Sequence, residues 1–352
     1  MSIDQIAEIL AEEAESLLTH TCNKIPNDLI TMPNGDHATR IFSQSDRSEA
    51  VTANLHRLYN HGNLSGTGYL SIFPVDQGME HTAAYSFYSN PLYFDPENIL
   101  KMAVEGGCNA VASTLGVLGL VSKKYADKIP FIVKVNHSEH LTNPALTNQV
   151  LFSSAEQAAN MGAAGVGATI YFGSNESHRQ IEEISALFAD AHKRGLFTIL
   201  WCYPRNDTYE RDGIDYASSV DITSQAIHIG VSLGADIIKQ KLPESSRGFS
   251  SLNFSKYSPE MYEALLTDNP IDLVRYQVAH SYMGKISMIN SGGEASGEND
   301  LKSAVRSAVI NKRGGGAGLI MGRKVFKKPF SEGLEILRAV QGVYASSEIT
   351  VA

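Results

Sequence analysis

Two lysines stand at the end of a short apolar run in the sequence. Lys239 closes Gly-Ala-Asp-Ile-Ile-Lys (234–239), and Lys241 follows two positions later. Side chains two positions apart share one face of a β-strand, so both ammonium groups point to the same side. Desolvation and a nearby like charge both disfavour the charged form of an inward lysine. A neutral amine near pH 7 can form a Schiff base with a ketone, whereas an ion-paired lysine at the rim of a sheet would have a structural role only.

Aromatic and acidic side chains end two other apolar runs. Trp201 and Tyr203 occur in Trp-Cys-Tyr-Pro-Arg (201–205), where their spacing again places both on one face. The Tyr203 phenol can exchange a proton with a substrate, or it can be a buried structural group. Asp76, in Pro-Val-Asp-Gln-Gly-Met-Glu-His (74–81), has either a chemical role or a structural one as a helix cap or loop ion pair.

Two glycine-rich turns end the last two apolar runs of the chain. They are Ile-Asn-Ser-Gly-Gly (289–293) and Ile-Met-Gly-Arg (320–323). Backbone N–H groups in such turns bind phosphate, and an arginine adds a planar set of donors. Either turn alone is also a common structural corner, but two turns with a basic residue favour a phosphate site. The candidate binding residues are Ser291, Gly292, Gly293, Gly322 and Arg323.

The elements that carry these residues alternate in type along the chain. From Gly66 onward, short apolar runs are separated by amphipathic stretches. Runs of this composition are typical of parallel strands that are covered on both faces. They are Tyr69–Val75, Ala110–Ser113, Pro130–Val135, Gly165–Ile170, Phe197–Tyr203, Ala235–Lys239, Ile286–Asn290 and Ala317–Met321. Eight strand–helix repeats predict an α/β protein of the (β/α)8 TIM-barrel class, with a doubly wound open sheet as the alternative.

Helix starts are indicated by polar residues that can accept hydrogen bonds from a first helical turn. These residues are Ser2 (with Gln5), Asp95 (with Pro96), Ser174 and Asp221. We expect each of them to cap a helix. Gly195, which follows His192, Lys193 and Arg194, is expected to end the third of these helices.

The first 65 residues do not share the alternation of strands and helices. A partial helical stripe of isoleucine and leucine covers residues 3–18, and residues 19–65 are polar and irregular in pattern. We expect residues 1–65 to form a helical and irregular extension. Residues 66–352 are expected to form the barrel domain on which it packs.

The predicted barrel explains why the candidate residues belong together. The carboxyl ends of its strands meet at one mouth, where active sites of this fold lie. The candidates stand at such ends, and so do Lys134 and Asn136 at the end of the third run. The segments 204–220, 242–258 and 293–299 follow the fifth, sixth and seventh strands and are expected to have little structure of their own, in a position where a lid would lie.

Composition excludes several classes of protein. The chain has 352 residues, with 29 basic and 38 acidic side chains and a net charge of −9. An acidic chain without a basic block is a poor ligand for nucleic acid or an anionic membrane, and no stretch approaches a membrane span. Its 3 cysteines are widely spaced, and no secretory signal is recognised at the start. We expect a cytoplasmic protein that binds a small molecule.

Taken in order, these motifs resemble the class I fructose-bisphosphate aldolases of the archaeal and bacterial (DhnA-type) family. The similar stretches extend over nearly the whole chain and comprise 66–81, 90–96, 166–174, 234–241, 289–293 and 320–328. The resemblance implies a barrel that cleaves fructose 1,6-bisphosphate reversibly to dihydroxyacetone phosphate and glyceraldehyde 3-phosphate, without a metal or other cofactor. It also implies a large homo-oligomer.

The resemblance assigns roles to individual positions. Those that match catalytic residues are Lys239 (the Schiff-base lysine), Tyr203 (the proton donor and acceptor) and Asp76 (the aspartate after the first strand). Those that match substrate-binding residues are Trp201, Ser291, Gly292, Gly293, Gly322 and Arg323. Lys134 and Lys241 are expected near the second phosphate or the iminium.

Three alternatives remain open at this point. The enzyme can act on another phosphorylated ketose, as relatives in the same superfamily do. A metal-dependent aldolase would use His81, His137 and His140, which stand near strand ends. A non-catalytic barrel that binds a sugar phosphate would keep the glycine turns but would have no use for Lys239 and Tyr203.

Overall fold

The sheet is a closed barrel of parallel strands. The computed structural model describes residues 1–79, 81–142, 147–295, 297 and 299–352. Within these residues the barrel strands are β1 (Leu70–Val75), β2 (Ala110–Thr114), β3 (Phe131–Lys134), β6 (Gly165–Phe172), β7 (Phe197–Pro204), β10 (Ile237–Gln240), β11 (Ser287–Ser291) and β12 (Gly318–Ile320). They pair in chain order, and β12 closes on β1. The eight predicted strands and the barrel are confirmed, and the open sheet is excluded.

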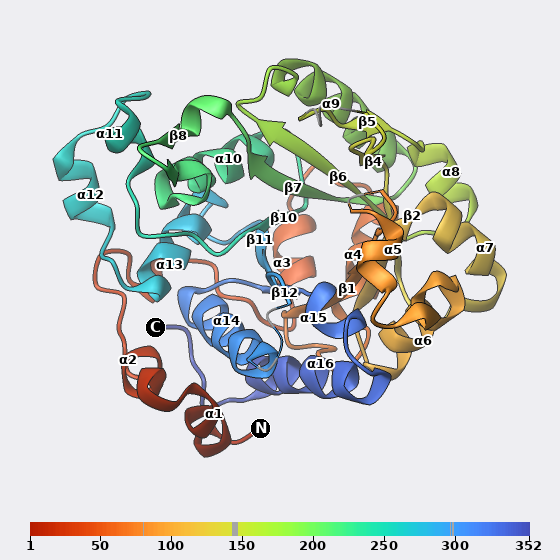
Figure 1. Ribbon diagram of the computed structural model, residues 1–352, viewed down its shortest axis with the longest axis horizontal. Helices are drawn as coiled ribbons and strands as arrows, with labels where there is room; N and C mark the ends of the chain where they lie inside the picture. The colour runs from red at the N-terminus through yellow and green to blue at the C-terminus, as the bar shows by residue number, and fades with distance from the viewer. Residues whose placement is uncertain (80, 143–146, 296, 298) are drawn as a thin grey trace.

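Helices cover the outside of the barrel (Figure 1). The longer ones are α6 (Pro96–Glu105), α7 (Leu115–Tyr125), α9 (Ser177–Lys193), α10 (Val220–Ser232), α13 (Pro270–His280), α14 (Asp300–Gly314) and α16 (Phe330–Ala345). The shorter ones are α5 (Ala83–Phe87), α8 (Ala155–Asn160), α11 (Gly248–Leu252), α12 (Pro259–Leu265) and α15 (Arg323–Phe326). Among the described residues, no helix has the length and apolar character needed to cross a membrane.

Two of the loops expected to lack structure contain regular elements. Residues 204–220 form the hairpin β8 (Glu210–Arg211) and β9 (Ile214–Asp215), and residues 242–258 contain α11. A further pair, β4 (Asn136–His137) with β5 (Val150–Leu151), follows β3. In the segment 293–299, residues 296 and 298 lie outside the described residues.

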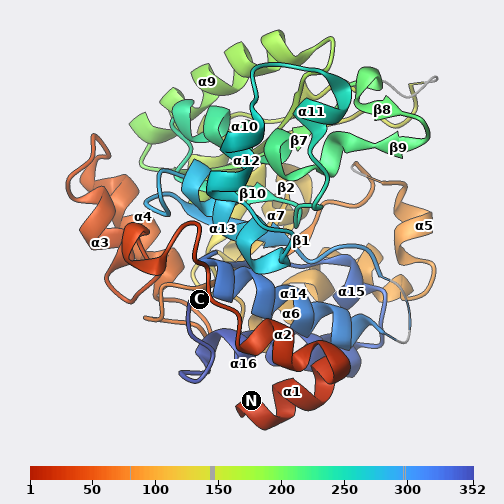
Figure 2. The same ribbon diagram turned by 90° about the vertical axis from the view of Figure 1, so that its left-hand side faces the viewer.

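The N-terminal 65 residues are more helical than their sequence pattern indicated. They form α1 (Ile3–Leu10), α2 (Ala14–Leu18), α3 (His37–Phe42) and α4 (Glu49–Tyr59). The predicted capping box of Ser2 and Gln5 is present at α1. Helices α1 and α2 pack against α14, as Figures 1 and 2 show, and Arg306 on α14 forms an ion pair with Glu13 at 2.8 Å.

Helix α4 closes the amino-terminal end of the barrel. Its buried side chains Val51, Leu55 and Leu58 belong to the same apolar cluster as the residues inside the barrel. Tyr59 lies beside the first residue of β11, with its hydroxyl 2.5 Å from the Ser287 Oγ. Figure 2 shows α3 and α4 on one side of the barrel and α5 with the β8–β9 hairpin on the opposite side. Because α4 covers the amino-terminal end of the barrel, the accessible mouth is the opposite end, where the strands have their carboxyl ends.

Two of the four predicted helix caps are wrong. Asp95 caps α6 as expected. The residue at the N-cap position of α9 is Glu176, so Ser174 does not open that helix. Ser219 precedes α10, and Asp221 lies within its first turn. The Asp221 carboxylate instead accepts hydrogen bonds at 2.9 Å from the backbone N–H groups at the start of α11, a contact across 27 residues that no local pattern reveals.

Candidate active site

Lys239 points into the barrel beside Trp201. In the pairing of β10 with β7 the two residues are register partners, so their side chains leave the sheet on the same face. The Lys239 Nζ lies 5.2 Å from the centroid of the Trp201 ring and 5.1 Å from that of the Tyr203 ring. The amine is thus held against two aromatic rings, on the inward face that the sequence predicted.

Gly167 leaves the space that the Trp201 ring occupies. A Cβ on Gly167 would lie 2.4 Å from Cζ3 of that ring, which is closer than side chains approach. The Trp201 indole is therefore positioned by the backbone of β6, which lies two strands away from β10 and Lys239. Sequence analysis did not single out Gly167, although a glycine within an apolar strand is a recognised sign of close approach.

Lys134 is buried at the end of β3. Its Nζ donates a hydrogen bond to the Asn136 carbonyl oxygen at 2.6 Å and lies 5.6 Å from the centroid of the Trp201 ring. It is not among the described residues that line the cavity at the barrel mouth. Lys134 thus lies next to the Trp201 ring, outside the set of residues that line the cavity.

The Tyr203 hydroxyl reaches the first glycine turn. It lies 3.2 Å from the Ser291 Oγ, which brings β7 and β11 together at the mouth. Arg205 lies over two tyrosine rings, with its guanidinium carbon 5.9 Å from the Tyr203 centroid and 5.6 Å from the Tyr171 centroid. Arg205 was not predicted as a site residue. The signal that could have found it is its spacing, because Arg205 lies two positions after Tyr203 and four after Trp201.

Asp76 follows β1 and faces a buried histidine. The Oδ2 of Asp76 lies 4.0 Å from the Nδ1 of His137. The other ring nitrogen of His137 lies 3.2 Å from the Lys134 carbonyl oxygen, which fixes the orientation of the imidazole. Through His137, the Asp76 carboxylate at the mouth is therefore linked to the end of β3.

The two glycine turns meet as predicted. The backbone N–H of Gly292 donates to the Ile320 carbonyl oxygen at 3.0 Å, which joins the two turns. A Cβ on Gly292 would lie 2.5 Å from the Met321 side chain, and one on Gly322 would lie 2.3 Å from the Pro74 carbonyl oxygen. Only glycine allows the backbones to approach this closely.

Basic side chains adjoin these turns. Arg323 donates a hydrogen bond of 2.6 Å to Glu294, and this pairing lowers the pKa of the Glu294 carboxyl. Lys324 is buried, which lowers the pKa of its ammonium, and it donates to the Ser303 Oγ at 2.7 Å. Sequence analysis did not select Lys324, since its position inside α15 has no local signal.

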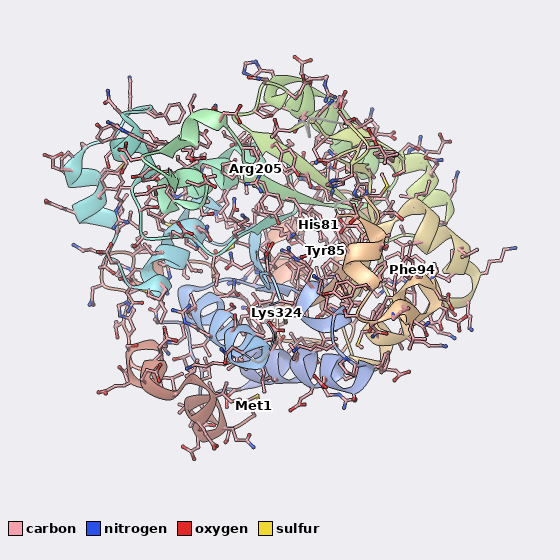
Figure 3. All side chains as sticks on the ribbon, in the orientation of Figure 1. Met1, His81, Tyr85, Phe94, Arg205 and Lys324 are labelled. Atoms are coloured by element: carbon pink, nitrogen blue, oxygen red, sulfur yellow. The ribbon has the colours of Figure 1, made fainter. Side chains whose placement is uncertain are left out.

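A cavity of about 860 Å³ opens at this mouth. Every residue predicted for the site except Lys134 lines it, namely Lys239, Tyr203, Asp76, Trp201, Lys241, Ser291, Gly292, Gly293, Gly322 and Arg323. Lining residues that sequence analysis had not selected for the site include Gln77, Tyr171, Arg205, Glu244, Glu294, Ser303, Arg306 and Lys324. Figure 3 labels Arg205, His81 and Lys324, which follow β7, β1 and β12 along the chain and lie in the middle of the view.

Cations gather at the cavity although the chain is acidic overall. Burial by the surrounding walls, and then the charge of Arg205, lower the pKa of the Lys241 ammonium. Arg323 contributes a smaller effect in the same direction. Such mutual repulsion among cations is relieved when an anion binds between them. The site is therefore suited to a ligand that carries phosphate.

The histidines of the metal-dependent alternative do not form a compact ligand set in the described part of the chain. The ring centroids of His81 and His140 are 6.3 Å apart, and His137 is turned toward Asp76. The side chains that do bring His, Cys or acidic ligand atoms within 4.8 Å of one another lie elsewhere, on the N-terminal segment and α13.

Several known proteins are similar to this chain. It is 50% identical over 347 residues, 99% of both chains, to a protein of Chlamydia muridarum named "Probable fructose-bisphosphate aldolase class 1". It is 26% identical over 287 residues, 79% of this chain and 82% of the relative, to the "Fructose-bisphosphate aldolase/6-deoxy-5-ketofructose 1-phosphate synthase" of Methanocaldococcus jannaschii.

A solved structure shares the fold. It is an archaeal fructose-1,6-bisphosphate aldolase with its catalytic lysine bound to the carbinolamine intermediate of the substrate. The match has a TM-score of 0.63 and 26% identity, and it covers 82% of this chain and 98% of the other. A family model described as "DeoC/LacD family aldolase" matches residues 70–328. With its barrel and its lysine-containing mouth, this chain belongs to the DeoC/LacD family of aldolases.

Proposed function

We propose that this protein is a class I fructose-bisphosphate aldolase that cleaves fructose 1,6-bisphosphate reversibly through a Schiff base on Lys239. The observation that carries the proposal is the position of Lys239. Its amine lies against Trp201 and Tyr203 inside a cavity whose rim holds the joined glycine turns and Arg323. The names of the full-length relatives give independent support.

The two phosphates fix the sugar in the cavity. One binds at the turns that contain Gly292, Gly293 and Gly322, where backbone groups and Arg323 face an anion. The other binds near Lys241 and Arg205, whose charges repel each other until an anion lies between them. Binding energy from both ends orients C2 of the ketose toward the amine.

The reaction begins when neutral Lys239 attacks C2 of the open-chain ketose. The carbinolamine loses water with proton transfer from Tyr203 and becomes an iminium, whose positive nitrogen withdraws electrons. Asp76 accepts the proton of the C4 hydroxyl, and the C3–C4 bond breaks to release glyceraldehyde 3-phosphate. The proton on Asp76 passes through water to the Tyr203 phenolate, and the restored phenol protonates C3 of the enamine. Water then hydrolyses the iminium, Tyr203 regains its proton, and dihydroxyacetone phosphate is released.

Borohydride trapping tests this assignment. Incubation of the protein with fructose 1,6-bisphosphate and borohydride is expected to leave a stable adduct on the peptide that contains Lys239, detected by peptide mass. Lys239→Met is expected to lose both adduct and activity, whereas Lys241→Met keeps the adduct because its amine is not the nucleophile. Activity that survives in Lys239→Met would refute the mechanism.

The name of the Methanocaldococcus jannaschii relative, which includes a synthase activity, supports a second candidate function. The same enamine can add its three-carbon unit to a different aldehyde. In that case the protein would be an aldolase or transferase that acts on another phosphorylated ketose. A competition assay that offers glyceraldehyde 3-phosphate and a second aldehyde to the enzyme, with dihydroxyacetone phosphate, separates the two candidates by their products.

We also propose that the protein is cytoplasmic and assembles as a large homo-oligomer. Three buried cysteines without disulfides, Cys22, Cys108 and Cys202, are consistent with a reducing compartment. Light scattering coupled to size-exclusion chromatography tests the assembly. A mass equal to that of one chain, 38.2 kDa, would refute it.

A further inference from the structure

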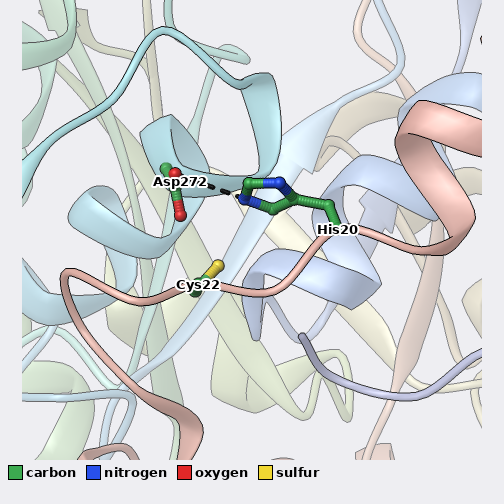
Figure 4. Close-up of side chains that lie close together, drawn as sticks. All are labelled: His20, Cys22 and Asp272. Carbon is green, nitrogen blue, oxygen red and sulfur yellow. Dashed lines mark ion pairs between the residues drawn. The ribbon is translucent and has the colours of Figure 1, made fainter.

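A cluster of three different metal-ligand types joins the N-terminal segment to α13. His20 and Cys22 lie on the irregular segment after α2, and Asp272 lies in the first turn of α13 (Figure 4). The Nε2 of His20 is 3.2 Å from the Oδ2 of Asp272, and all three ligand atoms lie within 4.8 Å of one another. None of the three lines the catalytic cavity.

The cluster is buried and its hydrogen bonding is incomplete. Cys22 is 2% exposed and Asp272 is 3% exposed. In the described part of the chain, the Oδ1 of Asp272 is buried without a hydrogen-bond partner, whereas the Nε2 of His20 contacts only the other carboxylate oxygen, Oδ2. Buried polar atoms without a partner are rare and each one requires an explanation. A ligand that accepts an electron pair from the Asp272 Oδ1 would satisfy this atom.

The contacts around the cluster orient its donors. Thr267 donates a hydrogen bond to Asp272 Oδ2, which holds the carboxylate toward His20. Arg313 donates to the His20 carbonyl oxygen at 2.5 Å, and Arg275 donates to the Ile25 carbonyl oxygen. These arginine contacts hold the segment in place from the side of α13 and α14. They also add positive charge nearby, which opposes a bare cation.

The donor set balances the charge of the metal itself. A soft or borderline divalent metal displaces the thiol proton and binds the thiolate. One thiolate and one carboxylate then balance the two charges of the metal. An imidazole and a thiolate favour zinc over magnesium or calcium, which prefer oxygen ligands.

The spacing of the atoms fits tetrahedral coordination. Zinc bonds of about 2.0–2.3 Å place neighbouring ligand atoms roughly 3.5 Å apart. The His20–Asp272 contact already has a similar length, 3.2 Å, and a side-chain movement of about 1 Å brings the thiol to the same spacing. The three side chains leave one position of a tetrahedral site open, which a bound water can fill.

We propose that His20, Cys22 and Asp272 form a binding site for Zn²⁺ that fastens the N-terminal segment to α13. Binding forms one bond from the metal to each side chain and releases the thiol proton to solvent. The site is structural and separate from the chemistry at Lys239, so the proposal does not depend on which substrate the enzyme uses.

Cobalt and zinc titrations of the full-length protein test the site. After treatment with a chelator and removal of the chelator, one equivalent of Co²⁺ is expected to produce a thiolate charge-transfer absorption band. Zn²⁺ is expected to abolish that band and to raise the melting temperature by about 2 °C or more. His20→Gln, Cys22→Ser and Asp272→Asn are each expected to weaken both effects at least tenfold in metal concentration.

His178→Gln is the matched control, because it removes an exposed histidine from α9, outside the cluster. It is expected to keep both responses. Circular dichroism establishes that each variant is folded, and His20→Gln is the decisive one since that side chain is the least buried of the three. Absence of the cobalt band in the folded wild-type protein, or an unchanged band in His20→Gln, would overturn the proposal.

Discussion

At the scale of single residues, the site combines one amine, one phenol and one carboxylate from three different strand ends. Lys239, Tyr203 and Asp76 were selected from the sequence because each follows or ends an apolar run. The structure shows the contact of the Tyr203 phenol, whose hydroxyl lies 3.2 Å from the Ser291 Oγ. A proton can therefore be held at a defined place beside the iminium.

Removal of that hydroxyl tests its role. Tyr203→Phe is expected to lower kcat by about 10²–10⁴-fold, the range for loss of a general acid–base group, while KM changes little. Ser291→Ala keeps the phenol and removes only its neighbour, so a much smaller loss is expected. Steady-state kinetics in the cleavage direction measures both variants. Equal losses in the two would show that the contact, and not the phenol itself, matters.

The charge of Lys241 provides a test by pH. Because burial and Arg205 lower its pKa, the ammonium loses its proton at a lower pH than an ordinary lysine does. Positive charge at the phosphate site therefore falls as the pH rises, and KM is expected to increase toward alkaline pH. Lys241→Arg stays charged and is expected to move this increase to higher pH. Identical KM profiles for the two proteins would exclude Lys241 as a phosphate ligand.

At the scale of elements, a glycine on one strand positions an aromatic ring on the next. A Cβ at Gly167 would meet Trp201 at 2.4 Å, so the β6–β7 pair and the indole are mutually adapted. The same ring lies 5.2 Å from the Lys239 amine. A change at Gly167 is thus transmitted to the nucleophile through a single side chain.

Gly167→Ala is expected to reduce the free energy of unfolding by about 1–3 kcal/mol, because the core has no space for a methyl group. It is also expected to lower kcat, since the indole must move against Lys239. Gly116→Ala on α7 is the control, because nothing lies within 4 Å of its Cβ position. Chemical denaturation and activity assays compare the two. An active and fully stable Gly167→Ala protein would contradict this account of how the ring is held.

At the scale of the whole molecule, the N-terminal segment is part of the barrel core. Leu55 is fully buried with the apolar residues inside the barrel, and Arg47 forms an ion pair of 2.5 Å with Asp236, just before β10. These contacts join residues almost two hundred positions apart. The boundary between an extension of residues 1–65 and a barrel domain of residues 66–352 remains a proposal, and the packing of α4 argues that the two parts fold together.

Leu55→Ala tests the contribution of α4. Loss of a fully buried leucine is expected to reduce the free energy of unfolding by about 2–5 kcal/mol, with a lower melting temperature. Leu120→Ala removes the same atoms from a leucine that is 76% exposed and is expected to change stability by less than about 0.5 kcal/mol. If the two variants melt at the same temperature, α4 does not stabilise the barrel.

Local sequence signals sufficed for the strands and for most of the site. The eight strands are buried on both faces and are therefore continuous apolar runs, and parallel pairing brings their carboxyl ends to one mouth. The same rule placed ten of the predicted site residues around one cavity. It could not reveal Lys324 or the contacts of Asp221, because their partners lie 21 and 27 residues away and leave no periodic pattern.

The sequence by itself determined the barrel, the nucleophile and the glycine turns, because burial and backbone geometry impose residue types locally. Only the tertiary structure decided that Lys134 lies outside the cavity lining, that Arg205 joins Lys241 in the cavity, and that α4 closes the far end. It alone brought His20 and Cys22 to Asp272, about 250 residues along the chain. Such contacts depend on how complete elements pack, and that packing is a property of the whole chain.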